Sequence, residues 1–342
     1  MSEQSQSKLA GRERTAIASL AATRVIQRLR FGVPGDEHCP AFDAMSLPIY
    51  LTLLAAGAAT VLLIVSLGFT VDFGVFFYAL WAGWAWLGGV LIKRMGHERI
   101  GTALEAIGLL YAGGFVFFFL IAAVTALAGP DADRMLSTAD HAIGFDWLRV
   151  ALALEPYQDL LRTITAIYRS LVWQPALIIA LLCLADRRGR VWMFLLAWFA
   201  TLAISSAIYP FVPAVGPMRF HGIPPDRFPG LLSDAPWTFG PLIHAIRDQG
   251  VRHLGAATLA GLITFPSFHA AGAVILGWAA WPLRAAGPLL VAANAIMVAA
   301  TIICGPHYLV DLIGGVAIAV VTICVSGRII AAWSGGLRSS TP

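Results

Sequence analysis

The chain has 342 residues, of which 58% are apolar and only 12% carry a charge, and its formal net charge is +4. Its mean hydropathy is +0.77, and its charged fraction is about half of that in an ordinary soluble domain. A soluble globule of this length could not bury so much apolar surface. The composition therefore excludes a soluble domain, a disordered chain and a small disulfide-bonded scaffold.

The first 46 residues are polar and basic, and no apolar stretch near Met1 indicates a cleavable signal peptide. Apolar residues between positions 17 and 29 alternate with arginines. This pattern leaves two alternatives open, a basic amphipathic helix on the cytoplasmic face of a membrane or a frayed tail.

The remaining apolar residues form continuous runs, which predicts an all-α integral membrane protein. A transmembrane β-barrel is disfavoured because its strands would alternate apolar and polar residues. Eight runs each predict a transmembrane helix. They cover residues 47–69, 73–92, 102–128, 171–185, 191–209, 266–281, 287–303 and 308–332. The fourth run is short, so its helix is expected to begin earlier, around Thr165.

Two long connections, 129–165 and 210–264, interrupt the series, and connections of this length in a compact protein are usually functional. Residues 333–342 are expected to form a polar tail. Eight spans would place both termini on one side, which carries about two thirds of the 23 lysines and arginines. The positive-inside rule then predicts cytoplasmic termini and long connections on the opposite side. Arginine in place of lysine, with abundant alanine and glycine, favours a bacterial cytoplasmic membrane.

Two histidines are expected at the starts of spans on the same side of the membrane. A Pro-Ser-Phe-His sequence ending at His269 opens the sixth span, and Pro306 and His307 open the eighth. Each proline is expected just inside its helix start, with the histidine in the first turn. Helix starts attract anions, so two of them carrying imidazoles suit a phosphate group.

The spacing around the second histidine indicates nucleophilic chemistry. His307 and Asp311 are four residues apart, so on a helix they share one face. The carboxylate can accept the proton of one ring nitrogen and leave the other as a nucleophile, while His269 can protonate a leaving oxygen. The alternative is that each histidine is a structural hydrogen-bonding group.

Two arginines are candidate phosphate ligands, because a guanidinium group matches the oxygens of a phosphate. Arg219 is the first cation after the fifth span, and Arg169 lies near the start of the fourth. By parity, both lie on the side of the two histidines. The alternative is that each arginine contacts lipid headgroups.

At these residues the chain resembles the type-2 phosphatidic acid phosphatase (PAP2) superfamily. Residues 266–269 match its Pro-Ser-x-His motif, and residues 307–311 match its His-x-x-x-Asp motif. The His-Tyr-x-x-Asp form, the following glycine pair 314–315 and the Gly-Pro-Met-Arg sequence at 216–219 are similar to the Aur1-like branch. That branch contains the inositol phosphorylceramide synthases and sphingomyelin synthases. The chain departs from the phosphatases at Phe268, where they usually have glycine, and at Thr301, where they have arginine.

The resemblance implies a six-helix catalytic core over about residues 101–332, with residues 47–100 as two accessory helices. It also implies a lipid phosphotransferase that moves a phospho-headgroup from a lipid donor to an alcohol acceptor through a phosphohistidine at His307. Arg219, Ser267 and nearby backbone amides would hold the phosphoryl oxygens. With water as the acceptor, the enzyme would instead be a lipid phosphate phosphatase. The missing arginine at Thr301 favours a phosphodiester substrate, and therefore transfer.

No metal or cofactor is expected, because arginines and helix starts supply the positive charge. The four cysteines lack metal-ligand or redox spacing. The expected partners are a lipid phosphate and the bilayer, with no nucleic acid. A phospholipid transporter or flippase is the alternative from another class, but the broken mid-membrane helices and paired repeats typical of transporters are not evident. A structural membrane subunit would leave the histidine–aspartate spacing unexplained.

Overall fold

The computed structural model describes residues 42–338, except 256, 257 and 259. The described residues belong to one of the two compact units into which the chain divides, Cys39–Pro342. The predicted amphipathic helix between positions 17 and 29 lies outside the described residues. The predicted tail begins as helix, because the last helix continues to Arg338.

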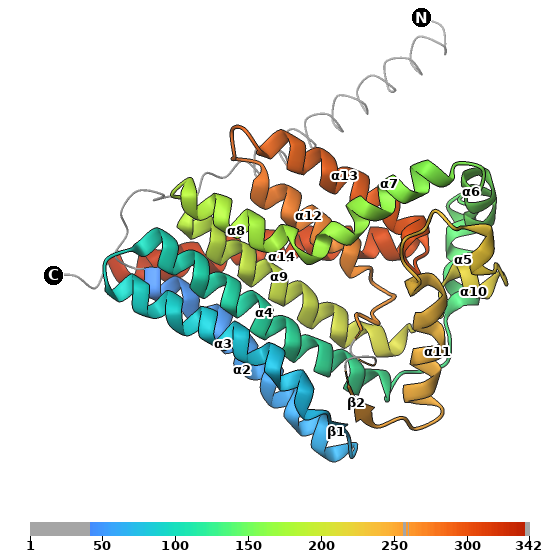
Figure 1. The fold of residues 1–342 in the computed structure, drawn as a ribbon, viewed down its shortest axis with the longest axis horizontal. Helices are drawn as coiled ribbons and strands as arrows, with labels where there is room; N and C mark the ends of the chain where they lie inside the picture. Colours follow the sequence, from blue (N-terminus) through green and yellow to red (C-terminus); the bar gives the residue numbers. More distant parts are fainter. Residues whose placement is uncertain (1–41, 256–257, 259, 339–342) are drawn as a thin grey trace, which may run out of the picture. The chain divides into compact units, whose positions relative to one another are not determined.

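The described part of the chain is mostly helical and has almost no strand, which confirms the all-α class (Figure 1). The helices are α2 Phe42–Ser66, α3 Phe73–Arg94, α4 Glu98–Thr125, α5 Asp133–Ala142, α6 Trp147–Leu154, α7 Gln158–Arg169, α8 Gln174–Leu184, α9 Arg188–Ile208, α10 Pro217–Phe220, α11 Ala235–Arg247, α12 Phe268–Ala280, α13 Gly287–Cys304 and α14 Leu309–Arg338. Two short strands, β1 Thr70–Val71 and β2 His253–Leu254, and the 3₁₀ turns η1 Ser170–Val172, η2 Tyr209–Phe211 and η3 Pro225–Arg227 complete the described elements.

All eight predicted spans fall on helices, but not all of these helices are full-length spans. Among the described residues, 6 helices are long and apolar enough to cross a membrane: α2, α3, α4, α9, α13 and α14. The pair α7 and α8 makes a seventh if it counts as one span, bent by 62° at its break. The expectation that the fourth span begins near Thr165 is therefore correct in place, but the helix is not straight.

The sixth predicted span, α12, has only 13 residues. Such a helix is roughly 20 Å long, against a hydrocarbon core of about 30 Å. Two carbonyl groups in its last turn are hydrogen-bonded inside the protein, because the guanidinium group of Arg190 on α9 donates to the carbonyl oxygens of Trp278 and Ala279. The same guanidinium lies 4.1 Å from the ring centre of Trp278. Helices α8, α9, α13 and α14 pack against α12.

The first two spans lie at the outside of the bundle. α2 and α3 pack against α4, and only 17% and 18% of their most apolar windows are buried, against 72% for α9. A buried carboxylate links these helices, since Glu105 on α4 accepts hydrogen bonds from Lys93 on α3 and Tyr50 on α2. This outer position is consistent with an accessory pair.

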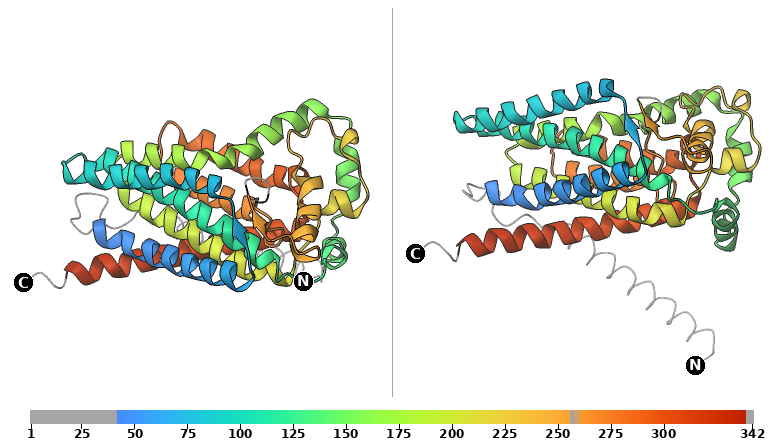
Figure 2. Two further views of the ribbon diagram at one scale, coloured as in Figure 1. Left: turned by 60° about the horizontal axis from the view of Figure 1, so that its bottom comes forward. Right: turned by 90° about the horizontal axis from the view of Figure 1, so that it is seen from below.

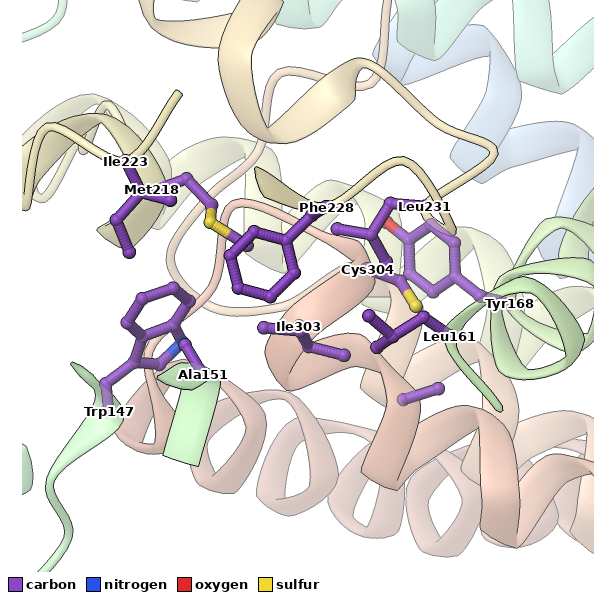
Figure 3. Packing of buried hydrophobic residues seen from close by; sticks show 11 residues of the cluster. Trp147, Ala151, Leu161, Tyr168, Met218, Ile223, Phe228, Leu231, Ile303 and Cys304 are labelled. Carbon is purple, nitrogen blue, oxygen red and sulfur yellow. The ribbon is translucent and has the colours of Figure 1, made fainter. Parts of the chain in front are cut away.

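Both long connections are folded, and they gather at one end of the bundle (Figures 1 and 2). The first contains α5, α6 and most of α7, and the second contains α10 and α11. Side chains from both connections form one apolar cluster with the end of α13, including Trp147, Tyr168, Met218, Phe228 and Ile303 (Figure 3). In addition, β1 and β2 pair in parallel, so the turn between α2 and α3 is bonded to the second connection.

Candidate active site

The imidazole of His307 is held through one nitrogen by a backbone carbonyl. His307 is 2% exposed, and its Nδ1 lies 2.9 Å from the carbonyl oxygen of Thr264, in the segment that leads into α12. A carbonyl oxygen can only accept a hydrogen bond, so Nδ1 carries the hydrogen. The neutral ring then keeps its lone pair on Nε2.

Asp311 is the more distant neighbour of this ring. Its Oδ2 lies 3.5 Å from Nδ1 of His307, and the same oxygen accepts a hydrogen bond of 2.8 Å from the backbone amide of Tyr308. The predicted contact within the pair is present, but the carbonyl of Thr264 is the closer acceptor and fixes the tautomer. The other carboxylate oxygen of Asp311 is buried and has no hydrogen-bond partner among the described residues.

The two predicted histidines lie together, as a single phosphate site built from both of them requires. The ring centres of His269 and His307 are 6.4 Å apart, with an interplanar angle of 55°. His269 is the second residue of α12, so its predicted place in the first turn is correct. On the ring of His269 lies Tyr168 from α7, with centres 4.2 Å apart and planes 11° from parallel.

The start of α14 differs from the prediction. Helix α14 begins at Leu309, so Pro306 and His307 precede it. The amides of Leu309 and Val310 each donate to the carboxylate of Asp140 at 2.9 Å. These amides are therefore not available to a phosphate, and the expectation that this helix start binds the anion is wrong.

The start of α12 remains open to an anion. Ser267 is the N-cap, and its Oγ accepts a hydrogen bond of 3.3 Å from the amide of Ala270. Pro266 precedes the cap, so neither predicted proline lies inside its helix. Among the described residues, no acceptor binds the amides of Phe268 and His269. Ser267 is buried, and its role as a phosphate ligand stays a prediction.

Asp133, a second aspartate on α5, links the segment 214–216 to Tyr308, the residue after His307. The carboxylate of Asp133 accepts hydrogen bonds from the amides of Val215 and Gly216 and from the hydroxyl of Tyr308, each 2.9 Å long. The amide of Ala214 donates to the hydroxyl of Thr264 at 3.0 Å. The segment 214–216, which precedes Arg219, is thereby bonded directly to Thr264. Through the carboxylate of Asp133 it is also linked to Tyr308, the residue after His307.

Gly216 brings this segment close to His307. It has a φ of 91°, a conformation that L side chains rarely adopt. A Cβ atom at this position would lie 2.5 Å from Cβ of Pro306, the residue before His307. Only glycine allows this contact, so the Pro-rich segment predicted to reach the phosphate does pack beside the second histidine.

The two predicted arginines are exposed. Arg219 lies in α10 with its alkyl chain beside Gly240, and it makes no hydrogen bond or ion pair within the described part of the chain. Arg169 follows Tyr168 at the end of α7 and donates to the carbonyl oxygen of Leu232 at 3.2 Å. Their roles as phosphate ligands stay predictions.

Buried carboxylates dominate the charge around the histidines. Asp133, Asp140 and Asp311 are 2%, 1% and 0% exposed, and their bonded donors are amides, one hydroxyl and one imidazole. Burial raises the pKa of Asp133, although the amide of Val215 and the hydroxyl of Tyr308 oppose this shift. Burial also raises the pKa of Asp140, against the opposing effect of the α14 amides. The site is therefore poor in positive charge at its centre.

Three residues of the site were not predicted: Asp133, Asp140 and Tyr168. The two aspartates are seven residues apart, so they share the buried face of α5 with Leu136. Tyr168 belongs to a buried stripe with Leu161 and Thr165 on α7. The helical spacing of both sets was visible in the sequence, but their partners lie far away in the chain.

Within the described residues, no group of three or more histidine, cysteine, aspartate or glutamate side chains could hold a metal ion. Cys183 and Cys304 are buried free thiols, and Cys324 is an exposed one.

A bundle of membrane-spanning helices that brings two histidines together, one with a free Nε2, defines a membrane protein suited to phosphoryl chemistry. The sequence profile of the PAP2 superfamily matches residues 134–325, more than half of the chain. The chain therefore belongs to the PAP2 superfamily. No match was found among the curated proteins or among the solved structures.

Members of this superfamily are phosphatases or phosphotransferases, so the protein is an enzyme of this superfamily. Membership supports a phosphatase-type activity on a lipid phosphate by a membrane-embedded protein, and it does not separate hydrolysis from transfer. The match extends from α5 into α14 and leaves α2, α3 and α4 outside it.

Proposed function

We propose that the protein is a membrane lipid phosphotransferase, which moves a phospho-headgroup from a lipid donor to an alcohol acceptor through a phosphohistidine at His307. The observation that carries the proposal is the contact between Nδ1 of His307 and the carbonyl oxygen of Thr264. It supports the tautomer with the hydrogen on Nδ1, in which the Nε2 lone pair is available for attack on phosphorus.

The proposed reaction has two balanced steps. In the first, the Nε2 lone pair of His307 forms the N–P bond while the bond from phosphorus to the leaving alcohol oxygen breaks. His269, in its imidazolium form, gives a proton to that oxygen and becomes neutral. In the second, the acceptor hydroxyl gives its proton to His269, its oxygen bonds to phosphorus, and the N–P bond breaks. The 6.4 Å between the ring centres supports a phosphoryl group between them.

Other residues of the site support these steps. Asp311 stabilises the positive charge that His307 gains during the attack, from its position 3.5 Å away. Arg219, Arg169 and Ser267 are proposed to hold the phosphoryl oxygens, together with the open amides at the start of α12.

The charge of the site favours a phosphodiester over a phosphate monoester. Three buried carboxylates lie beside His307 or bond to the three residues that follow it, Asp311 to the ring and to Tyr308, Asp133 to Tyr308, and Asp140 to Leu309 and Val310, while the two candidate arginines are exposed. Two like charges brought close together repel each other strongly inside a protein. A diester carries one negative charge and a monoester up to two, so the diester is repelled less. Cleavage of a headgroup diester followed by capture with an alcohol is transfer.

Hydrolysis, with water as the acceptor, is the second candidate, and membership of the PAP2 superfamily supports it. Membership of a superfamily of enzymes also favours catalysis over the flippase alternative. We further propose that residues 101–332 form the catalytic core, with 47–100 as an accessory pair. The positive-inside rule supports cytoplasmic termini and an active site on the opposite side of a bacterial cytoplasmic membrane.

The test is lipid mass spectrometry after overexpression of the wild type, His307→Ala and the control variant His97→Ala. His97 is exposed and makes no capping hydrogen bond at the start of α4. We expect a new phospho-headgroup lipid with the wild type and His97→Ala, and none with His307→Ala at equal protein in the membrane. Loss of a lipid phosphate without a new lipid would show hydrolysis instead. Full activity of His307→Ala would overturn the mechanism.

A further inference from the structure

We infer that Tyr168 belongs to the phosphate site, with its hydroxyl donating a neutral hydrogen bond to the phosphoryl group carried by His307; this inference rests on the proposed function. Tyr168 is 4% exposed and comes from α7, an element that the sequence motifs do not include. Its ring lies flat on that of His269, at 4.2 Å between centres. The stack fixes the direction in which the hydroxyl points.

The position of the hydroxyl follows from Gly305. A Cβ atom on this glycine would lie 2.7 Å from Cδ2 of His307 and 2.9 Å from the hydroxyl oxygen of Tyr168. The hydroxyl and Cδ2 are therefore no further apart than the sum of these two distances. Cδ2 is the ring atom bonded to Nε2, the proposed nucleophile. The Tyr168 hydroxyl thus lies near the ring atom next to the proposed nucleophile, and the proposal places it within reach of an oxygen on the bound phosphorus.

This hydroxyl has no partner in the described part of the chain, although the side chain is buried. Tyrosine hydroxyls normally find a partner when buried. The two tyrosines that are 0% exposed each have a partner, since the hydroxyl of Tyr308 donates to Asp133 and that of Tyr209 accepts from Thr125. The hydroxyl of Tyr168 neither donates nor accepts a hydrogen bond within the described residues, and it is not one of their fully enclosed unpaired atoms, so it faces space that a ligand can enter.

Neighbouring polar groups do not satisfy this hydroxyl. Tyr168 lies at one edge of the apolar cluster that joins the two long connections (Figure 3). The backbone carbonyl oxygen of Thr301, 3.3 Å from the same Cβ position on Gly305, accepts from the amide of Gly305. The hydroxyl of Thr301 donates to the carbonyl oxygen of Met297 in its own helix. The hydroxyl of Thr165 donates to the carbonyl oxygen of Leu161. Tyr168 is thus the hydroxyl at this corner that is left to bind substrate.

A neutral donor also suits the charge of the site. With three buried carboxylates near the histidines, a phenol adds a hydrogen bond to a phosphoryl oxygen without a charge that would pair with them. Removal of one preorganised donor from a developing oxyanion typically lowers kcat by about 10²–10³-fold. Since the bond strengthens as charge develops, kcat should change much more than KM.

The test is a titration with orthovanadate, which becomes five-coordinate when a nucleophile binds it and then mimics phosphoryl transfer, on purified protein in detergent. The variant Tyr168→Phe keeps the ring stack and removes only the oxygen. Tyr209→Phe is the matched control, because Tyr209 is fully buried and its hydroxyl bonds to Thr125. Thermal unfolding midpoints equal to the wild type show that each variant is folded.

We expect orthovanadate to bind the wild type and Tyr209→Phe alike, about tenfold more weakly to Tyr168→Phe, and not to His307→Ala. On the donor lipid found by mass spectrometry, Tyr168→Phe should lower kcat by about 10²-fold with KM little changed. Wild-type affinity and kcat in Tyr168→Phe, with His307→Ala still unable to bind, would overturn only the role of Tyr168. Equal behaviour of wild type and His307→Ala would overturn the proposed function itself.

Discussion

Replacement of Asp133 by asparagine should loosen the segment 214–216 from the histidine pair. The carboxylate accepts three hydrogen bonds of 2.9 Å, from the amides of Val215 and Gly216 and the hydroxyl of Tyr308. An asparagine side chain has one acceptor oxygen, and its nitrogen only donates. At least one of the three donors then loses its acceptor. A buried donor left unpaired costs about 1–3 kcal/mol, which lowers Tm by several degrees.

The effect on activity should exceed the effect on stability. Gly216 packs on Pro306, next to His307, so a shift of this segment moves the site. A misplacement of about 1 Å in an active site can lower the rate by 10²-fold. We expect Asp133→Asn to lose turnover of the donor lipid by about this factor, measured beside Tm in detergent.

Asp131→Asn is the control for this prediction. Asp131 lies just before α5, and its partly exposed carboxylate pairs with His244 and Arg247 rather than with the site. This variant should keep turnover close to that of the wild type. If Asp133→Asn matches the wild type in both Tm and turnover, then the carboxylate does not hold the segment, and the reasoning is refuted.

Two further predictions concern the surroundings of His307. Gly305→Ala should lower activity at least about tenfold without unfolding the protein, because its Cβ would lie less than 3 Å from atoms of His307 and Tyr168. The control Gly57→Ala, at a position with open space around it, should have the activity of the wild type. Equal activity of both variants would contradict this packing. Burial raises the pKa of Asp140 above its ordinary 3.8, so the native state binds this proton more readily than the unfolded chain. The stabilisation that Asp140 contributes is then fully present at pH values below its ordinary pKa, and it is lost as the pH rises through its pKa in the native state. The Tm of the wild type relative to Asp140→Asn should therefore fall as the pH rises above about 4, and a difference independent of pH would contradict the shift.

The order of the spans and the meeting of the two histidines followed from local signals. Apolar runs of sufficient length mark membrane helices, and two motifs at the starts of next-but-one spans must lie in the same leaflet. The sequence therefore places His269 and His307 on the same side of the membrane, while their contact depends on the packing of α12 against α14. It could not show that α12 is short, because that depends on Arg190 reaching its last carbonyl groups from another helix.

The second layer of the site escaped prediction for a physical reason. Asp133 and Asp140 lie in a long connection, where acidic residues are usually solvated. What distinguishes them is that their carboxylates accept hydrogen bonds from the amides of Val215 and Leu309, which lie 82 and 169 residues further along the chain. A hydrogen bond over such a separation leaves no trace in local composition. The same holds for Thr264, whose carbonyl rather than Asp311 fixes the tautomer of His307.

The parallel pairing of β1 with β2 has a mechanical consequence. Thr70 and Val71 join the first two membrane helices to His253 and Leu254, and the chain then runs ten residues from Leu254 to Thr264. The connection between α2 and α3 is thereby hydrogen-bonded to β2, which lies ten positions before Thr264 in the sequence. The carbonyl oxygen of Thr264 contacts the imidazole of His307. A shortened protein that starts at α4 would keep every motif residue, yet it would lack this pairing and the contacts of α2 and α3 with α4.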